Sequence, residues 1–248
     1  MKILSPACRR QGLFGLLGLL LYTPSAMKRF AAFLALSFLL AACGSKIVQF
    51  TVTFSTTDDA NLQELRGAVT RVIEGRVLAK QKKVLKQDMA EAEGKTVVTV
   101  TLPDAETAQM LKDGLTAPFS MSIMKQVETG QGDIISEKFG EFKETGIVTK
   151  HVDWVIGGTV KDATDGKATA VIVFTKEGEA LVKDLFVKNR GAVIGIFVRE
   201  QLMSKKLIDA KDANLTSIAI DGIPSEALAK AFADDVNVGL HVTFTAMP

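Results

Sequence analysis

The sequence predicts an α+β fold in which a βαββαβ order of elements occurs twice, in residues 48–127 and in residues 168–248. Two observations in each region support this order. Short runs alternate between apolar and polar residues, which is typical of strands with one buried face. Segments with apolar residues three and four positions apart, typical of amphipathic helices, separate these runs. A third observation divides the chain: residues 128–167 are polar, rich in glycine and weakly periodic.

The first unit opens with a strand at residues 48–54, which alternate with period two. A helix follows from Asp58 and Asp59, because acidic side chains are favoured at a helix N-terminus. Its expected apolar face contains Leu62, Leu65, Val69, Val72 and Ile73. The later elements are predicted as two strands, a short helix opened by Pro103-Asp104 and a final strand, at residues 82–90, 96–102, 103–112 and 119–127.

The second unit follows the irregular connecting segment 128–167, in which only residues 147–148 and 154–156 resemble strands. Its predicted strands lie at residues 170–174, 192–198, 215–220 and 238–244, and its predicted helices at residues 176–188 and 224–233. Together the two units indicate antiparallel sheets of ferredoxin-like order, with helices on one face. A single larger mixed sheet is the alternative.

The N-terminal region predicts a lipoprotein export signal at residues 27–42. Lys28 and Arg29 give it a basic start, an uncharged apolar stretch follows, and Ala41-Ala42 precede Cys43. The apolar stretch has 13 residues, whereas a transmembrane helix, the alternative, needs roughly 20. We therefore expect cleavage before Cys43 and lipidation of its sulfur, with palmitate among the acyl chains, and residues 43–47 as the tether.

A second apolar run lies further upstream, behind Arg9 and Arg10. Two export signals in series serve no purpose, so we interpret residues 1–26 as a mis-assigned start or a leader extension and expect Met27 to be the true start. After lipidation of Cys43 no free cysteine would remain, which excludes disulfides and thiolate metal sites.

The short tether predicts where the folded part works. The first strand starts five residues after Cys43, and an extended residue covers at most about 3.6 Å, so that strand would begin within about 20 Å of the lipid headgroups. We expect a lipid-anchored location on the periplasmic side of the cell envelope, on either the inner or the outer membrane. Residues 1–42 hold five of the 30 basic residues and none of the 28 acidic ones, so the mature net charge would be −3. No basic excess is left to favour nucleic acid as a partner.

No group of residues predicts catalysis, a metal site or a cofactor. His151 and His241 are the only histidines and lie 90 positions apart; we expect His151 in a loop and His241 solvated on the last strand. The acidic pairs Asp58-Asp59 and Asp234-Asp235 are better explained by helix capping and solvation than by acid–base chemistry. The sequence therefore predicts a protein that is not an enzyme.

An apolar patch for unfolded polypeptide is predicted at Phe142, Trp154 and Ile156. A lone tryptophan between aliphatic residues is more often part of a core, and that placement is the competing interpretation for Trp154.

Six segments, which occur in the expected order, resemble the first periplasmic domain of SecD, a subunit of the bacterial protein-export translocase. They are VVTVTLP at 97–103, FSMSI at 119–123, ETGIVTKHV at 144–152, AVIVFTKEGEA at 170–180, GAVIGIFV at 191–198 and IPSEALA at 223–229. The resemblance covers about residues 60–248. It implies a base and a mobile head, the head including about residues 119–200, and contact with exported chains and Sec translocase subunits.

The chain also departs from that family. An Asp-Gly turn is replaced by Arg199-Glu200 and an Ala-Pro pair by Ser204-Lys205, and two later motifs, Gly-Gly and Gly-Ala-Leu-Pro, are absent. No bundle of membrane helices follows Pro248, so we expect no transduction of a proton gradient. The resulting hypothesis is a non-catalytic module that contacts exported polypeptide. The alternative is an envelope lipoprotein with a structural or assembly role and no substrate handling.

Overall fold

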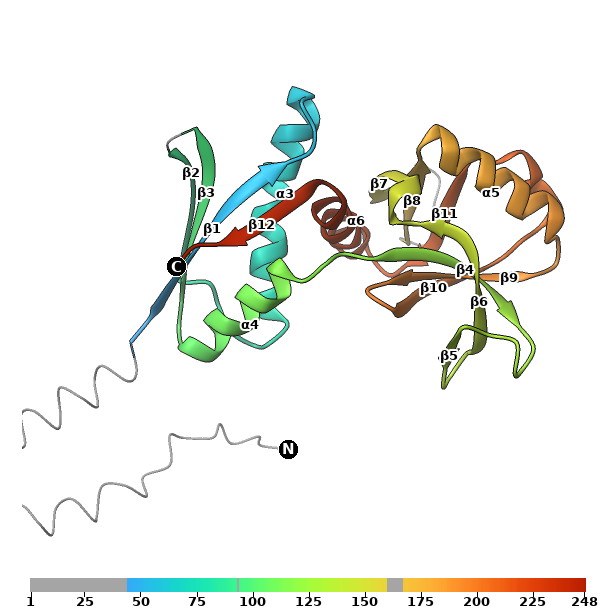
Figure 1. The fold of residues 1–248 in the computed structure, drawn as a ribbon, viewed down its shortest axis with the longest axis horizontal. Coiled ribbons are helices and arrows are strands. Elements are labelled where there is room, and N and C mark those ends of the chain that lie inside the picture. Colours follow the sequence, from blue (N-terminus) through green and yellow to red (C-terminus); the bar gives the residue numbers. More distant parts are fainter. Residues whose placement is uncertain (1–43, 93, 160–166) are drawn as a thin grey trace, which may run out of the picture. The chain divides into compact units, whose positions relative to one another are not determined.

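The computed structural model describes residues 44–92, 94–159 and 167–248, and residues 47–248 form one compact unit (Figure 1). The predicted signal peptide, the proposed start at Met27 and the lipidation of Cys43 lie outside the described residues. The structure has mixed α and β elements in antiparallel sheets, as the sequence predicts.

A four-stranded sheet forms the first part of the compact unit, in the order β12-β1-β3-β2. We call this part the four-stranded half. Its elements are β1 (Lys46–Phe54), α3 (Asp59–Leu78), β2 (Lys86–Ala92), β3 (Lys95–Leu102), α4 (Ala105–Thr116) and β12 (Val242–Ala246). The order 4-1-3-2 is that of a ferredoxin-like unit. Its fourth strand, however, comes from the C-terminus: Phe50 pairs with Ala246 and Phe54 with Val242.

The sheets therefore do not divide at the boundary predicted after residue 127. The strand expected to close the first unit, β4 (Met121–Val127), pairs instead with β6 and β9. A strand that is apolar on both faces fits a central position, and the burial pattern of β4 shows Met121, Ile123 and Met124 all buried.

Two further sheets form the second part, which we call the two-sheet half: a five-stranded sheet β10-β9-β4-β6-β5 and a three-stranded sheet β11-β8-β7. Besides β4, its elements are β5 (Ile134–Ser136), β6 (Gly140–Val148), β7 (Val152–Thr159), β8 (Ala168–Phe174), α5 (Lys176–Lys188), β9 (Val193–Val198), β10 (Gln201–Leu207) and β11 (Ser217–Ile223), with 3-10 turns at Thr149–His151 and Ala210–Asn214. The second predicted βαββαβ unit is not confirmed. The segment predicted as irregular contributes β5, β6 and β7.

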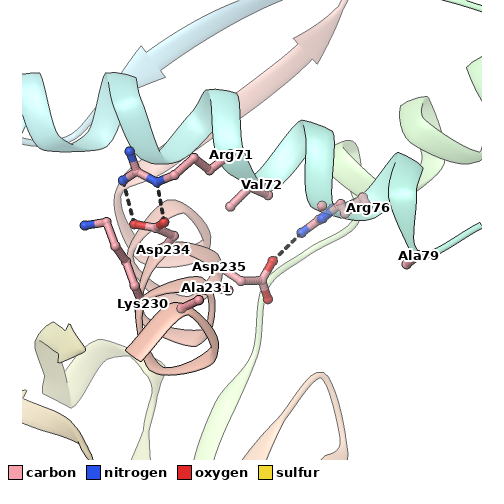
Figure 2. Close-up of a pocket in the computed structure, with 10 residues that line it drawn as sticks. Arg71, Val72, Arg76, Ala79, Lys230, Ala231, Asp234 and Asp235 are labelled. Atoms are coloured by element: carbon pink, nitrogen blue, oxygen red, sulfur yellow. Dashed lines mark hydrogen bonds and ion pairs between the residues drawn. The ribbon is translucent and has the colours of Figure 1, made fainter. Parts of the chain in front are cut away.

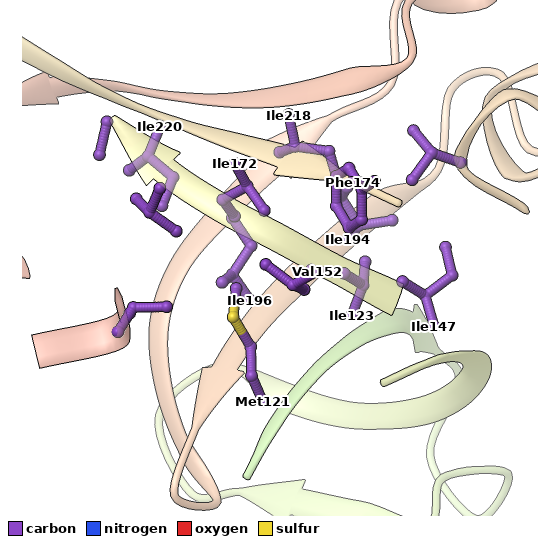
Figure 3. Packing of buried hydrophobic residues seen from close by; sticks show 14 of the residues in the cluster. Met121, Ile123, Ile147, Val152, Ile172, Phe174, Ile194, Ile196, Ile218 and Ile220 are labelled. Carbon is purple, nitrogen blue, oxygen red and sulfur yellow. The ribbon is translucent and has the colours of Figure 1, made fainter. Parts of the chain in front are cut away.

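Two main cores correspond to the two halves. In the four-stranded half, α3 and α4 pack on one face of the sheet over Phe50, Val98 and Val100. In the two-sheet half, aliphatic side chains from both sheets meet, among them Ile123 and Ile172 (Figure 3). A small third cluster contains Met124, Phe142 and Phe197.

Helix α6 (Glu226–His241) contributes to both cores: Ala233 and Val236 belong to the second, Val238 to the first. The sequence predicts that this helix ends at residue 233, but it continues to His241. The prediction is wrong because Val238 and Leu240 fit either a helix or an alternating strand. Asn237 fixes the helix to the edge of β7. Its side-chain amide donates to the carbonyl of Val155 and accepts from the Val155 N–H, both at 2.8 Å.

Helix starts agree with the sequence-based capping arguments. The Asp58 side chain accepts from the N–H of Asn61 at 2.9 Å, and Asp104 caps α4 by accepting from the N–H of Thr107 at 2.7 Å. Hydrogen bonds from the hydroxyl and backbone of Thr107 and from Lys82 lower the pKa of Asp104 to about 2. The acidic pair at Asp58-Asp59 is thus explained by capping.

Candidate functional site: the groove between α3 and α6

The three residues of the predicted apolar patch do not come together on the surface. Phe142 is fully buried and packs edge-to-face against Phe197, with ring centroids 5.1 Å apart. Trp154 is half-buried and stacks on His241. Ile156 is 57% exposed. Of the three, Phe142 is not available for surface contact, because it is buried in a cluster with Met124 and Phe197.

The two histidines have structural partners. His151 is buried in the 3-10 turn Thr149–His151, where Nδ1 accepts from the N–H of Val148 at 3.0 Å. His241 is the last residue of α6 rather than part of a strand. Its Nε2 donates to the carbonyl of Asp153 at 2.7 Å, which leaves Nδ1 to accept from the hydroxyl of Ser55 at 3.2 Å.

A groove of about 480 Å³ lies where α3 and α6 cross. Its walls combine apolar or small residues with charged ones. The first wall consists of Val72, Gly75, Arg71 and Arg76 from α3 and Ala79 just after it, and the second of Ala227, Ala231, Lys230, Asp234 and Asp235 from α6. Figure 2 shows the arginines of α3 directed toward the two carboxylates of α6. Small side chains on facing helix surfaces leave the space between them unfilled.

Gly75 keeps the α3 wall of the groove open. A Cβ added to Gly75 would meet no atom within 4 Å. Glycine is unfavourable inside a helix, so its presence in the last third of α3 is not explained by helix stability.

One edge of the groove is fixed by a two-pronged ion pair. Arg71 donates to Asp234 from Nε at 2.6 Å and from a terminal nitrogen at 2.9 Å. Asp234 is 4% exposed, so this contact neutralises a buried charge and binds α3 to α6.

Asp235 lies between two arginines from different parts of the fold. Arg76 of α3 donates to it at 3.0 Å, and Arg199, from the turn between β9 and β10, donates at 2.5 and 3.3 Å. Burial acts to raise the pKa of Asp235, but hydrogen bonds and charge from Arg199 and Arg76 outweigh it and lower the pKa. Arg76 also donates to the carbonyl of Gly114, and Arg199 lies over the Phe119 ring at 5.1 Å.

This cluster connects the two halves. Asp235 and Arg76 join α6 to α3, and Arg199 adds the five-stranded sheet of the two-sheet half. The backbone at Arg199 has φ of 48°, and the next residue, Glu200, has φ of 65°. Both values are unusual for residues with side chains. The Arg199-Glu200 turn is also one of the departures from the SecD pattern, and in this chain it supplies the second arginine.

The sequence-based interpretation of Asp234-Asp235 as a solvated pair at a helix end is wrong. The pair lies within α6, and both carboxylates are in ion pairs. The signal was present: Ala229, Ala233, Val236 and Leu240 repeat with helical spacing through the pair, so continuing the helix would have placed both acids inside it.

Each carboxylate of the groove is held by arginine, and apolar or small side chains form part of its wall. Among the described residues, no cluster of three or more His, Cys, Asp or Glu side chains could hold a metal ion. Within the described ranges, no helix is long and apolar enough to cross a bilayer.

Comparisons with known proteins give similarity only at the level of solved structures. No protein-family model and no curated protein matches the chain. A structure described as "a membrane component SecDF that enhances protein export" is 14% identical, with a TM-score of 0.44, over 82% of this chain and 98% of that one. SecDF in a super-membrane-facing form is 14% identical (TM-score 0.45), and SecDF from Thermus thermophilus 16% (TM-score 0.44), over 84% and 81% of this chain. This chain spans about 30% of each of the latter two.

Proposed function

We propose that this chain is a non-catalytic, SecD-like module of protein export, lipid-anchored through Cys43 on the periplasmic side, which contacts translocating or newly exported polypeptide. The observation that carries the proposal is the α3–α6 groove, in which apolar or small residues lie beside Arg71, Arg76 and Lys230 and both carboxylates are already paired. Such a groove accepts apolar side chains without requiring one sequence. The sequence resemblance to SecD supplies the export context.

Two exposed leucines lie next to lining residues of the groove in the sequence of α3 and α6. Leu78 is 65% exposed and lies one turn from Gly75 on α3, and Leu228 is 54% exposed and lies one turn from Ala231 on α6. Large exposed aliphatic side chains beside a groove are typical of binding surfaces. An extended polypeptide could place one or two apolar side chains in the groove and contact either leucine at its rim. Ile156 on β7 is a second exposed contact residue in this proposal.

The test is site-specific photo-crosslinking in the full chain. A photoreactive amino acid replaces Leu78, and a secreted substrate is stalled during export in the same cells. We expect an adduct with the substrate. The control position is Ala60, which is also exposed on α3 but four turns from Gly75. Equal adduct yields at the two positions, or no adduct at Leu78, would contradict contact through the groove.

The anchor is tested separately. Palmitate labelling of the full chain should mark the wild type and leave Cys43→Ala unlabelled; an unlabelled wild type would exclude the anchor. Membrane fractionation distinguishes the alternative assembly role. A domain tethered within about 20 Å of the outer membrane could not contact the export channel in the inner membrane, so exclusive outer-membrane location would favour the alternative.

A further inference from the structure

The loop that joins α3 to β2, residues 79–85, lies in a strongly basic stretch. Residues 75–87 contain five basic side chains and no acidic one, although the whole sequence has 28 acidic residues. The basic residues are Arg76, Lys80, Lys82, Lys83 and Lys86. All four lysines are exposed, so the loop presents a concentrated positive charge to solvent.

Only part of this charge is neutralised within the protein. Lys82 pairs with Asp104 at 3.1 Å, and Lys86 pairs with Asp88 at 2.6 Å. In the part of the chain that the structure describes, the side chains of the other two lysines, Lys80 and Lys83, have no ion-pair partner. These two charges are therefore available to an external anion.

A large apolar side chain accompanies the free lysines. Leu85 is 57% exposed, although its backbone is held in place by a hydrogen bond from its N–H to the carbonyl of Thr101 at 2.9 Å. At the other end of the loop, the N–H of Gln81 donates to the carbonyl of Leu78 at 2.7 Å. Proteins that bind to the surface of a bilayer combine cationic side chains with an apolar one in this way.

The loop lies at the end of the four-stranded sheet where β1 begins. Helix α3 follows β1 and runs back along the sheet, and β2 starts at the same end, where Lys86 pairs with Thr101 near the end of β3 (Figure 1). Ile47, at the start of β1, is 65% exposed. Cys43 precedes it by four residues, which span at most about 14 Å when extended. An anchor at Cys43 would hold this end of the sheet close to the bilayer.

We propose that the α3–β2 loop binds the headgroups of anionic phospholipids, with Lys80 and Lys83 on the phosphates and Leu85 at the boundary with the acyl chains. Lysine binds phosphate as a point charge without a fixed geometry, which suits a fluid layer of headgroups. The anchor gives proximity to the bilayer, and the loop fixes which end of the four-stranded half faces it. This inference rests on the membrane location proposed above and adds a second, non-covalent contact with the bilayer.

Photo-crosslinking to phospholipid in cells tests the contact. The full chain carries a photoreactive apolar amino acid at Leu85, and the cells grow with radioactive phosphate. We expect a labelled adduct; the acyl chains of a lipidated Cys43 hold no phosphate and cannot supply the label. The control position is Ala60, exposed in the first turn of α3 and about 27 Å along the helix from its last residue. No labelled adduct at position 85, equal yields at both positions, or an adduct with protein instead would overturn the proposal.

Removal of the two free charges makes the test specific. Lys80→Gln with Lys83→Gln should lower the adduct at position 85 by about tenfold or more, since each lysine near an anionic surface strengthens binding about fivefold. The matched control, Lys176→Gln with Lys183→Gln, removes the same charge from exposed positions of α5 and should leave the yield unchanged. Mass spectrometry of the wild-type adduct should find anionic lipids enriched over phosphatidylethanolamine. Equal yields in the two double variants, or lipids in proportion to their share of the membrane, would overturn the proposal.

The outcome is separable from that of the anchor. A chain labelled by palmitate but without the phospholipid adduct would refute the loop contact and leave the anchor standing. A phospholipid adduct at position 85 in a chain without palmitate would support the loop contact and refute the anchor.

Discussion

The two halves of the molecule differ in how the chain builds them, although α6 belongs to both cores. The two-sheet half is continuous, with all its strands between Met121 and Ile223. The four-stranded half is interrupted: β1 to α4 come first, and its last strand, β12, is added only after the whole of the two-sheet half. The four-stranded half therefore depends on contacts that fix α6, whereas the two-sheet half has most of its core without them.

The largest effect is expected from Asn237→Ala. Asn237 is 3% exposed and satisfies both backbone groups of Val155, so its loss leaves a buried N–H and a buried carbonyl without partners. We expect a loss of about 2–4 kcal/mol in the free energy of unfolding, measured by urea denaturation. The control Lys230→Ala, exposed on the same helix, should change it by less than about 0.5 kcal/mol. A small loss in Asn237→Ala would show that α6 is not fixed to β7 by this side chain.

The two arginine contacts should differ in the next experiment. Arg71→Ala removes the ion-pair partner of Asp234, a buried carboxylate, and we expect it to cost about 2 kcal/mol. Arg199→Ala leaves Asp235 with Arg76, and we expect about 1 kcal/mol. Denaturation of both variants measures the difference. If Arg199→Ala lost more stability than Arg71→Ala, the contact between the two halves would contribute more to stability than the contact between α3 and α6.

Acidification should weaken the same connection. The pKa of Asp235 is lower in the folded protein than the unfolded value of about 3.9. Its contribution to stability is therefore complete above that value and is lost as the pH falls through the lower, folded pKa. Asp235→Asn should thus be less stable than wild type at pH 6 and lose less stability between pH 6 and pH 3. An unchanged pH dependence in Asp235→Asn would contradict the assignment.

The smallest effect has the opposite sign. Gly75→Ala should stabilise the protein by about 0.5–1 kcal/mol, because alanine is the better helix former and its Cβ points into open space. Gly157→Ala is the matched contrast, since its Cβ would lie 2.2 Å from the carbonyl oxygen of Ala229 on α6, and it should destabilise. Thermal unfolding of both variants measures these two changes in stability. If Gly75→Ala destabilised the protein, the space beside Gly75 would be occupied and the groove would not be open there.

The sequence predicts local structure better than the connections between elements. The predicted helix at 176–188 agrees with α5, and α4 starts next to Pro103-Asp104 as predicted, although it continues beyond residue 112. The sheets could not be assigned, because alternation along one strand does not say which strand lies beside it. β10 was missed since lysines interrupt its apolar positions. Only the end of β6, at residues 147–148, was recognised, because the register of β6 shifts beside β4 and breaks the alternation.

The candidate site was missed for a related reason. Arg71, Arg76 and Arg199 have ordinary surface patterns in the sequence, and their partners lie 36 to 163 positions away. Only the crossing of α6 over α3 brings them together. The predicted patch failed at Phe142 because the sequence does not show that the five-stranded sheet encloses its own small cluster.

The most direct measurement of the central claim combines groove filling with crosslinking. With the photoreactive residue at Leu78 in the full chain, Gly75→Trp should lower the adduct with a stalled export substrate at least tenfold, because the indole would occupy the groove. Ala60→Trp, on the same helix outside the groove, should leave the adduct unchanged. An unchanged adduct in Gly75→Trp, with the protein still folded, would contradict the proposal that this groove binds exported polypeptide.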